Sequence, residues 1–321
     1  MFHREDIMKK TNLRAILGAF VLALVLTSCA STPKEAPATL TKTESRAFWR
    51  IDGTDKNGNP STVYIQGTFH LGDERIFPLS EEVQQAFVNS DRYAGEISTQ
   101  GYAALAQMGP VLNAPNKDGK LVTDHLTEEE KAFVQMAFGE NLSIVDPLEP
   151  WQIKTALSLL VYTNTGLSSE YGLDNSFVAT LSQNGYEWDG LDDLQVQLDI
   201  ITFGDYDTQI RMLKDLLKVF LDEKESEELT KSTVELYDSY VNDDMKKMEK
   251  LLTMSNKKEE DSDQLYIDYN HMVFRDRNQE WAQDITNYLD EGGTTFIFAG
   301  CGHWLGPDST FKFLKKMKTI K

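Results

Sequence analysis

Two short apolar runs, far apart in the chain, each end at a glycine and are followed by a histidine. The first is "VYIQGTFH", which contains Gly67 and ends at His70, and the second is "TTFIFAGCGH", which contains Gly300 and ends at His303. Short runs rich in β-branched and aromatic residues predict strands. Glycine lets the backbone turn sharply or approach a ligand closely. The pattern therefore predicts two strands that each deliver a histidine at one end of a sheet.

The hydrophobic pattern around the first histidine alternates between strand and helix. An apolar run at residues 48–51 is followed by "DGTDKNGNPS", whose Asn-Gly and Asn-Pro pairs are typical of a hairpin turn. "PLSEEVQQAFVNS" predicts a helix capped by Ser80, and "RYAGEIS" predicts a strand that carries Glu96. This order of strand, helix and strand indicates an α/β fold, which we place in one domain over residues 48–321 with a mixed central sheet flanked by helices.

The middle of the chain has a mostly helical pattern. Thr127 and Glu130 have the spacing of a capping box, and Pro150 suits a helix start. "LDNSFVATLSQNG" predicts a helix capped by Asp174, "YEWDGL" predicts a short strand, and residues 195–254 predict long helices with solvated charged faces. The last predicted helix has an apolar stripe formed by Trp281, Ile285 and Leu289. We therefore expect a long helical middle segment within the same domain.

The N-terminal pattern predicts export. "MKKTNLRAILGAFVLALVLTSCAS" has basic residues, an apolar core too short to span a bilayer stably, and small residues before Cys29. Leu-Thr-Ser-Cys resembles the lipobox of bacterial lipoproteins, in which the cysteine is lipidated and becomes the new N-terminus; the alternative is an ordinary signal peptide with an incidental cysteine. We expect a lipoprotein signal peptide over residues 1–28, lipidation at Cys29 and a flexible tether over residues 29–47. The acidic stretch before Met8 is unlike such a signal, so translation starts at either Met1 or Met8.

Charge narrows the choice of partners. The chain has a net charge of −19, and residues 1–28 contribute +2, so the rest carries −21. This argues against nucleic-acid binding and against attraction to anionic lipid, so a lipid anchor would have to hold the protein at the membrane of the bacterial cell envelope. The chain has two cysteines, and if Cys29 carries lipid, Cys301 has no partner for an internal disulfide. We therefore expect stability to come from a packed core.

The paired histidines indicate metal chemistry. Two neutral imidazoles and a carboxylate can hold a divalent ion with positions open for water or substrate, and such a set permits manganese, cobalt, zinc or iron. Glu96, near the end of its predicted strand, is the candidate third ligand beside His70 and His303. It could instead act as a general base, or be a solvated residue of an edge strand. The sequence has no H-E-x-x-H motif, so it is not a zincin. We therefore expect the strands that lead to His70 and His303 to be adjacent or nearly so. One ion shared by both histidines requires their rings to lie within roughly 10 Å of each other.

Further motifs occur in a fixed order along the chain. "QGTFHLGDERIFPLSEEV" and "YAGEIS" are followed by "YGLDNSFVATLSQNGYEWDGLDDLQVQL", "RDRNQEWAQDI" and "FIFAGCGHWLGPD". Together they resemble the TraB/GumN family, to which the Tiki-type metalloproteases are related. The resemblance implies that His70, Glu96 and His303 correspond to the family's motif histidines and glutamate. It also implies that Arg277 and Asn278 correspond to the family's Arg-Asn pair.

Two positions depart from the family pattern. Asp192 stands where the family usually has glutamate, so we assign it no role, and Cys301 stands where a small residue is usual.

Arg277 could stabilise a developing oxyanion or bind a substrate carboxylate, or it could pair with a buried acid such as Asp174. Asp174 and Asn278 are possible accessory residues of the site.

The resemblance also implies a function. The related Tiki proteins act as metal-dependent peptidases, so we expect an envelope-anchored, metal-dependent hydrolase that acts on peptides or proteins, with Glu96 and Arg277 as catalytic residues. The alternative is a non-catalytic lipoprotein that binds a peptide or another signal. A purely structural role would not explain why the chain carries two matching histidine motifs.

The remaining candidates are expected to be structural. Cys301 could form a nucleophile pair with His303, but residues two positions apart seldom form the required hydrogen bond, so a small buried filler is the better interpretation. His125 and His271 match no motif and are expected at the surface or in structural roles. Three tryptophans are expected in the core, namely Trp49, Trp151 and Trp281.

Overall fold

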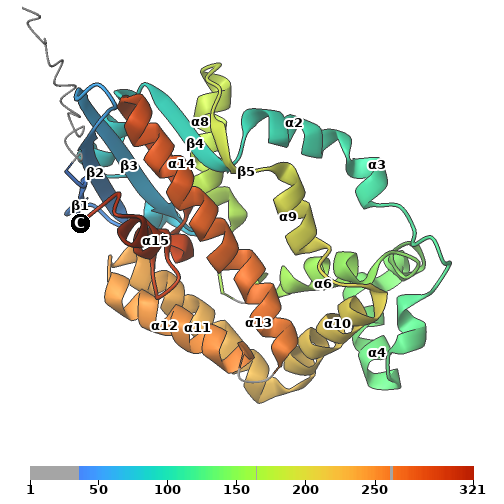
Figure 1. The fold of residues 1–321 in the computed structure, drawn as a ribbon. Helices are drawn as coiled ribbons and strands as arrows, with labels where there is room; N and C mark the ends of the chain where they lie inside the picture. The colour runs from blue at the N-terminus through green and yellow to red at the C-terminus, as the bar shows by residue number, and fades with distance from the viewer. Residues whose placement is uncertain (1–35, 164, 261–262) are drawn as a thin grey trace, which may run out of the picture. The chain divides into compact units, whose positions relative to one another are not determined.

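A six-stranded mixed sheet forms the centre of a computed structural model that describes residues 36–163, 165–260 and 263–321 (Figure 1). The strands lie in the order β1-β2-β3-β6-β4-β5. β1, β2 and β3 are joined antiparallel, whereas β3, β6, β4 and β5 run parallel. The strands span Thr39–Lys42 (β1), Phe48–Thr54 (β2), Pro60–Thr68 (β3), Arg92–Ile97 (β4), Asp189–Asp192 (β5) and Gly293–Gly300 (β6). The predicted α/β fold with a mixed sheet is confirmed, and the predicted signal peptide and Cys29 lie outside the described residues.

The sheet begins earlier in the chain than the sequence predicts. β1 lies in the stretch predicted as a flexible tether, and Leu40 is paired with Ile51 of β2. The backbone N–H of Ala38 donates to the carbonyl of Thr319, 2.8 Å away, which ties this stretch to the C-terminal end. The prediction of a tether up to residue 47 is therefore wrong from residue 38 onward. The pattern missed β1 because a four-residue edge strand with one apolar side chain carries almost no periodic signal.

The β2–β3 hairpin forms where the turn residues predict it. One carboxylate oxygen of Asp55 accepts hydrogen bonds from the backbone N–H groups of Asn57 and Asn59, each at 2.8 Å. Gly58 has φ +82°, a left-handed conformation that the Asn-Gly pair allows. The hairpin fixes the register of β3, the strand that leads to the first histidine.

The last strand of the chain lies between two earlier ones. β6 is paired with β3 on one side, with Thr68 opposite Gly300, and with β4 on the other, with Gly95 opposite Phe298. Because the three strands are parallel, their carboxyl ends meet at one edge of the sheet. The prediction that the strands leading to the two histidine motifs are neighbours is confirmed.

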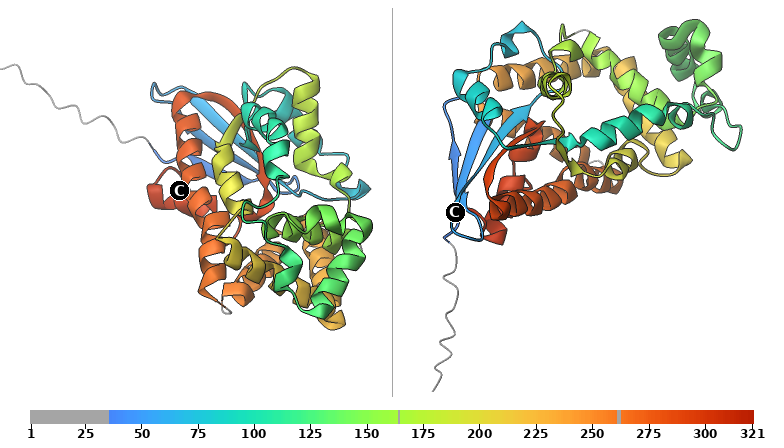
Figure 2. Two further views of the ribbon diagram at one scale, coloured as in Figure 1. Left: turned by 90° about the vertical axis from the view of Figure 1, so that its right-hand side faces the viewer. Right: turned by 90° about the horizontal axis from the view of Figure 1, so that it is seen from above.

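Helices cover the sheet and form a further group beside it (Figures 1 and 2). The α-helices are α1 (Glu81–Val88), α2 (Thr99–Gln107), α3 (Gly109–Leu112), α4 (Glu128–Phe138), α5 (Leu142–Val145), α6 (Pro150–Ser158), α7 (Leu160–Thr163), α8 (Leu173–Gln183), α9 (Leu194–Ile201), α10 (Tyr206–Leu221), α11 (Glu223–Val241), α12 (Met245–Glu260), α13 (Gln264–Asn270), α14 (Arg277–Glu291) and α15 (Thr310–Met317). A π-helical stretch, His271–Asp276, joins α13 to α14. Single 3₁₀ turns span Glu74–Ile76, Val122–His125, Gly139–Asn141, Ser169–Tyr171 and Cys301–Trp304.

Side-chain alternation places α8 and α14 on opposite faces of the sheet. Phe177 of α8 packs against Phe296 of β6, with ring centroids 5.3 Å apart. Phe48 of β2 also faces Phe296, at 6.0 Å, so the next residue, Trp49, points to the other face. There Phe311 of α15 meets Trp49 edge-on at 5.4 Å, and α15 lies against α14. The sheet is therefore buried on both sides, as parallel sheets generally are.

The middle segment has an apolar core of its own. Its buried members are Val122, Leu126, Val134, Ile153, Leu157, Ile210, Leu213 and Leu217. They come mainly from α4, α6 and α10, which Figure 1 shows beside the sheet rather than over its faces. The sequence predicted helices here but not that they would build a second core.

Some local predictions are confirmed and others are wrong. The capping box of Thr127 forms, and Pro150 is the first residue of α6. Gly172 rather than Asp174 precedes the first turn of α8, so the predicted cap is wrong. Trp151 is only partly buried, so its assignment to the core is also wrong. The stripe on α14 is buried as predicted, with Trp281, Ile285 and Leu289 at most 4% exposed.

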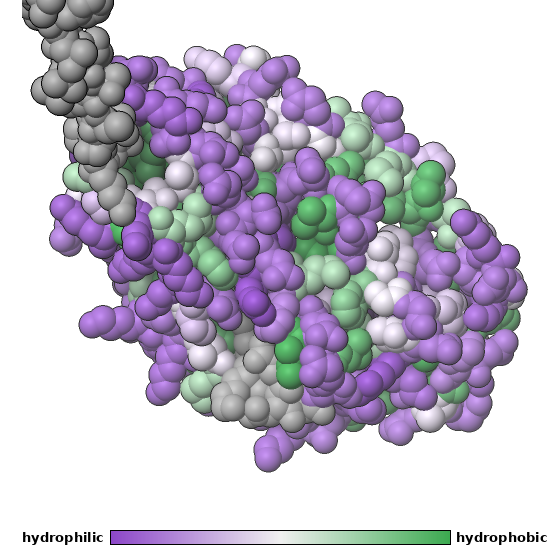
Figure 3. Space-filling view, in the orientation of Figure 1, coloured by the Kyte–Doolittle hydropathy of each residue, from purple (hydrophilic) through white to green (hydrophobic). Residues whose placement is uncertain are grey.

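Polar side chains cover most of the face shown in Figure 3, in keeping with the net charge of −19. Among the residues that the structure describes, no helix combines the length and the apolar content needed to cross a membrane.

Candidate functional site

Neighbouring parallel strands bring polar side chains together at their carboxyl ends. His70 follows β3, His303 follows β6, Glu96 lies near the end of β4, and Asp192 ends β5. Open α/β sheets bind their ligands at this edge. The sequence predicted two histidines and a glutamate here, and the structure adds Asp192.

His303 is held rigidly and is 5% exposed. Its ring packs against the rings of Trp281 and Phe274, with centroids 4.2 and 5.3 Å away. Burial, together with the nearby positive charge of Arg277, lowers the pKa of His303 to about 3. The imidazole is therefore neutral at physiological pH and can offer a lone pair.

The hydrogen bonds of Asn278 decide which ring nitrogen offers that lone pair. The Asn278 amide N–H₂ donates to the carbonyl of Asp308 at 2.8 Å, so its oxygen faces His303. The hydroxyl of Thr310 also donates to that oxygen, at 3.2 Å. Nδ1 of His303 lies 2.7 Å from the same oxygen and must therefore carry the proton. Nε2 is left unprotonated.

His70 is oriented in a similar way by a carboxylate. Its Nδ1 lies 3.0 Å from Oδ2 of Asp174, in the first turn of α8. This hydrogen bond and the charge of Asp174 raise the pKa of His70 to about 9. The other oxygen of Asp174 is buried without a hydrogen-bond partner in the described structure. The side chain of His70 is 66% exposed, so the site opens to solvent on this side.

Both carboxylate oxygens of Glu96 accept hydrogen bonds. Oε1 accepts from the backbone N–H of Gly300 at 2.8 Å, and Oε2 accepts from Arg277 at 2.7 Å. Burial alone would raise the pKa of Glu96, but the charges of His303, Arg277 and His70 and the Gly300 N–H lower it to about 2. Glu96 is therefore ionised and paired, which excludes its interpretation as a solvated edge-strand residue.

Arg277 binds two acids at once. Its Nε and Nη2 lie 2.9 and 2.7 Å from Oδ2 of Asp192, and Nη2 also bonds Glu96. Nη1 donates to the carbonyl of Val273 at 2.9 Å, so little of the guanidinium remains for a substrate. Trp281 donates to the second oxygen of Asp192 at 2.7 Å. The partner suggested from the sequence, Asp174, is wrong, because Asp174 binds His70.

Asp192 is the site residue that the sequence analysis missed. It is 8% exposed at the end of the short strand β5, where an unpaired carboxylate would be costly. A carboxylate at the end of a predicted strand could have indicated a site residue. Asp192 was nevertheless assigned no role, because the family usually has glutamate at this position.

Gly300 keeps open the point on which the three candidate ligands converge. A Cβ at this position would lie 3.1 Å from Oε1 of Glu96, 3.6 Å from Cδ2 of His303 and 4.0 Å from Nε2 of His70. Cδ2 of His303 and Nε2 of His70 can therefore be no farther apart than the sum of the last two distances. That separation is inside the roughly 10 Å limit set by a shared ion.

The donor chemistry suits a divalent ion, but the arrangement is incomplete. Each histidine is hydrogen-bonded through Nδ1, as metal-binding histidines usually are. Nε2 of His303 is already unprotonated, whereas His70, whose pKa is about 9, must lose a proton from Nε2 before it can bind an ion. However, no group of three or more His, Cys, Asp or Glu side chains in the described residues is arranged to hold a metal ion. Arg277 already supplies a positive charge to Glu96. An ion would therefore need Glu96 to shift or to share its carboxylate.

A family model described as the TraB/PrgY/gumN family matches residues 47–320. The chain belongs to this family. The match covers nearly all of the described structure, and it confirms the family suggested by the sequence motifs. An uncharacterized protein of Treponema pallidum (strain Nichols) is 24% identical over 330 residues, covering 99% of this chain and 96% of the relative. No solved structure matches the chain significantly.

The other residues singled out in this TraB/PrgY/gumN chain do not belong to the converging group. Cys301 is 1% exposed, and burial raises the pKa of its thiol, so it is not a ready nucleophile. Gly67 leaves room for its neighbours, because a Cβ there would lie 3.0 Å from the sulfur of Cys301. His125 is exposed on a 3₁₀ turn, and His271 begins the π-helical stretch.

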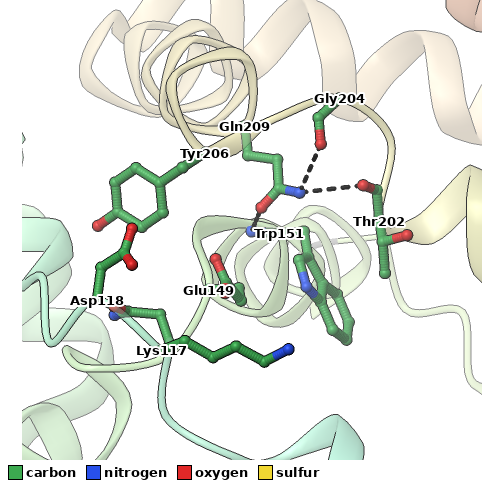
Figure 4. A pocket seen from close by; sticks show the side chains of 9 residues that line it. Lys117, Asp118, Glu149, Trp151, Thr202, Gly204, Tyr206 and Gln209 are labelled. Carbon is green, nitrogen blue, oxygen red and sulfur yellow. Dashed lines mark hydrogen bonds between the residues drawn. The ribbon is translucent and has the colours of Figure 1, made fainter.

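Another cavity lies elsewhere in the fold. It measures about 410 Å³ and is formed by the middle helical segment around Trp151, Glu149 and Tyr206 (Figure 4). In Figure 4 the side-chain amide of Gln209 donates to the backbone carbonyls of Thr202 and Gly204. These hydrogen bonds, of 3.0 and 3.1 Å, hold Gln209 in the cavity wall. None of the converging side chains at the sheet edge lines this cavity, so we assign the chemistry to the sheet edge and not to the cavity.

Substituting Gly300 with alanine tests whether the convergence point matters. Gly300 has φ −48°, which alanine adopts freely, so the melting temperature should change by only a few degrees. The new methyl group would fill the space between Glu96, His303 and His70. We expect divalent-ion affinity, measured by calorimetric titration, to fall at least about tenfold. Unchanged affinity in a folded Gly300→Ala variant would show that an ion, if bound, lies elsewhere.

Proposed function

We propose that this member of the TraB/PrgY/gumN family is a hydrolase of peptide bonds that uses a divalent ion held by His70, Glu96 and His303. One observation carries the proposal. The two histidines reach the same point from adjacent strand ends, each with Nδ1 already hydrogen-bonded, and the ionised Glu96 lies beside them. Manganese, cobalt, zinc and iron all suit such a ligand set.

The residues of the chain would prepare the site in distinct ways. A bound divalent ion supplies Lewis acidity and an activated water at neutral pH. Asn278 keeps Nε2 of His303 unprotonated, and Asp174 orients His70. Arg277 keeps Glu96 ionised, so that Glu96 can serve either as a ligand or as the base that accepts a proton from water. With most of its N–H groups engaged, Arg277 is better suited to position Glu96 than to contact a substrate.

A second candidate is a protein that binds a peptide without cleaving it. The specific observation in its favour is the ion pair between Arg277 and Glu96, which already neutralises the carboxylate that an ion would need. In that case the exposed His70, with its raised pKa, would be a cationic contact for an acidic group of the ligand.

Cleavage of a broad peptide library distinguishes the two candidates. The hydrolase proposal expects cleavage that stops with chelator and returns with one of the four candidate ions. A His70→Ala, His303→Ala double variant should cleave nothing. If the ion-loaded protein cleaves nothing, yet peptides bind the parent and a Glu96→Gln variant equally, the hydrolase is abandoned and the binding protein is kept.

We also propose that the protein is exported and anchored by lipid at Cys29, facing peptide or protein substrates in the cell envelope. The support is the sequence alone, because Leu-Thr-Ser-Cys follows a basic and then an apolar stretch. A Cys29→Ser variant should lose both palmitate labelling and membrane association in cell fractionation. A variant that stays in the membrane fraction and still takes up label rules out lipidation at this position.

A further inference from the structure

The C-terminal stretch of this acidic chain carries only positively charged side chains. Residues 309–321 contain five of the chain's 32 lysines and arginines and none of its 51 aspartates and glutamates. All five lysines are exposed, and none of them forms an ion pair with an acid in the part of the chain that the structure describes. We call them the basic C-terminal surface, which consists of Lys312, Lys315, Lys316, Lys318 and Lys321.

The needs of the helix account for only part of this surface. Lys315 and Lys316 lie in the last turn of α15, where positive charge stabilises the helix. Lys312 is the third residue of the same helix, where positive charge is unfavourable. Lys318 and Lys321 follow the helix. The accumulation of positive charge therefore points to a partner outside the chain.

An apolar side chain lies among the lysines. Met317 is 39% exposed, while the opposite side of α15 is buried through Phe311, Phe313 and Leu314. Lysines beside an exposed apolar residue are typical of surfaces that bind the head-group region of a bilayer. The composition therefore suits a membrane surface better than a small ligand, for which the stretch offers no enclosed space.

The described chain enters the fold beside this surface. The backbone N–H of Ala38 donates to the carbonyl of Thr319 at 2.8 Å, and the N–H of Lys321 donates to the carbonyl of Ala38 at 3.1 Å. Figure 1 shows α15 and the C-terminus next to β1. Cys29 stands seven positions before Ala36, a length of chain that spans at most about 25 Å. If Cys29 carries lipid, the membrane therefore lies within that distance of this end of the domain.

This end of the domain is opposite to the candidate site. A Cβ on Gly53 would lie 3.1 Å from the Cβ of Ala38, and Gly53 pairs with Ser61 at the start of β3. From there β3 runs to Thr68, seven residues and about 23 Å away, at the edge where the histidines converge. A membrane that contacts the entry point of the chain therefore leaves the candidate site facing away from the bilayer.

We propose that the basic C-terminal surface docks on anionic phospholipid head groups of the membrane that anchors the protein, and so orients the candidate site away from the bilayer. Clusters of about four to eight basic residues next to a membrane anchor bind such head groups. The overall charge of −19 does not prevent this, because at about 0.15 M salt charges are screened beyond about 8 Å. An acid near the entry point, Asp290, is already paired with Lys56 at 3.3 Å.

The inference rests on the proposed export and lipid anchor, and it does not depend on the hydrolase. Contact through lysines alone is reversible, so the surface complements the lipid at Cys29 and does not replace it.

The test is vesicle binding by a protein that carries no lipid. Residues 29–321 with Cys29→Ser keep every described residue and lack the acyl chains. The protein is sedimented in about 0.1 M salt, where charges act over about 10 Å, with vesicles of phosphatidylglycerol and phosphatidylcholine in equal parts or of phosphatidylcholine alone. It should sediment with the anionic vesicles only, and about 1 M salt should release it. Sedimentation with neither kind of vesicle, or equally with both, overturns the proposal.

A triple variant locates the contact. Lys315→Gln, Lys316→Gln and Lys318→Gln, made together, should weaken binding to the anionic vesicles at least about tenfold. Glutamine is about as good a helix former as lysine, so the fold should persist, which circular dichroism verifies. The matched control changes the net charge equally by replacing three exposed lysines elsewhere with glutamine, namely Lys117, Lys224 and Lys231. Equal weakening in the two triple variants contradicts the assignment to the C-terminal surface.

A fluorescent reporter tests the orientation. On anionic vesicles the emission of a Met317→Trp variant should shift to shorter wavelength relative to the parent, because the indole enters the head-group region. A Met136→Trp variant, at a methionine of α4 that is 73% exposed, is the control and should not shift. A shift in Met136→Trp without one in Met317→Trp shows that another face meets the membrane, and overturns the proposal.

The outcome is separable from those of the earlier proposals. Vesicle binding by the lipid-free protein, together with no palmitate label at Cys29 in cells, keeps the surface and abandons the anchor. Label at Cys29 without vesicle binding keeps the anchor and abandons the surface. Peptide cleavage in solution should be the same in the parent and in the triple variant, so the hydrolase stands or falls separately.

Discussion

An Arg277→Met variant should lose about 3–5 kcal/mol of unfolding free energy, because breaking a buried ion pair leaves its charged partners uncompensated. Arg277 is 6% exposed and holds both Glu96 and Asp192 at 2.7 Å. Methionine has a similar length but cannot neutralise either carboxylate. Urea denaturation of parent and variant measures the difference.

Arg75→Met is the matched control. Arg75 also binds two acids, Asp73 and Asp238, but its side chain is 47% exposed. Exposed pairs of this kind contribute about 0–1 kcal/mol, so this variant should unfold almost like the parent. Equal losses in both variants would mean that Arg277 does not act through the buried acids.

Glu96→Gln should lower the hydrolytic kcat/KM by about 10²–10⁴, the range for loss of a general base. The substitution keeps the size of the side chain and removes the charge that either a ligand or a base needs. Asp192 still neutralises Arg277, so the fold should persist. The assay uses whichever peptide of the library the parent cleaves, with circular dichroism to verify the fold.

Glu81→Gln provides the comparison for this second prediction. Glu81 lies exposed in the first turn of α1, and its loss should leave the rate unchanged. If Glu96→Gln cleaves as fast as Glu81→Gln, Glu96 neither binds the ion nor accepts the proton. The site would then have to be reassigned around the two histidines alone.

The sequence predicted the parts of the site that depend on strand ends. A glycine after an apolar run, followed by a histidine, is a local signal, and it occurs twice, at His70 and at His303. The adjacency of the two strands followed from the expectation that both histidines serve one site, and the insertion of β6 between β3 and β4 realises it. Glu96 was predictable for a similar reason, because a carboxylate within a strand needs a partner.

The parts that the sequence missed depend on contacts between distant segments. Asp174 looks like a helix cap until His70, 104 positions away, offers a better partner. Asp192 and Arg277 are 85 positions apart, and neither residue signals the other locally. β1 was missed because its pairing with β2, rather than its own composition, makes it a strand. Local patterns thus predicted the elements, while the ion-pair network appeared only once the elements were packed.

Metal analysis of the purified protein tests the central claim most directly. The protein is incubated in turn with manganese, cobalt, zinc and iron, freed of excess ion, and measured by elemental analysis beside the His70→Ala, His303→Ala double variant. The account predicts about one equivalent of one of these ions in the parent and none in the double variant. Equal metal content in the two proteins, or no retained ion in the parent with any of the four metals, would contradict it.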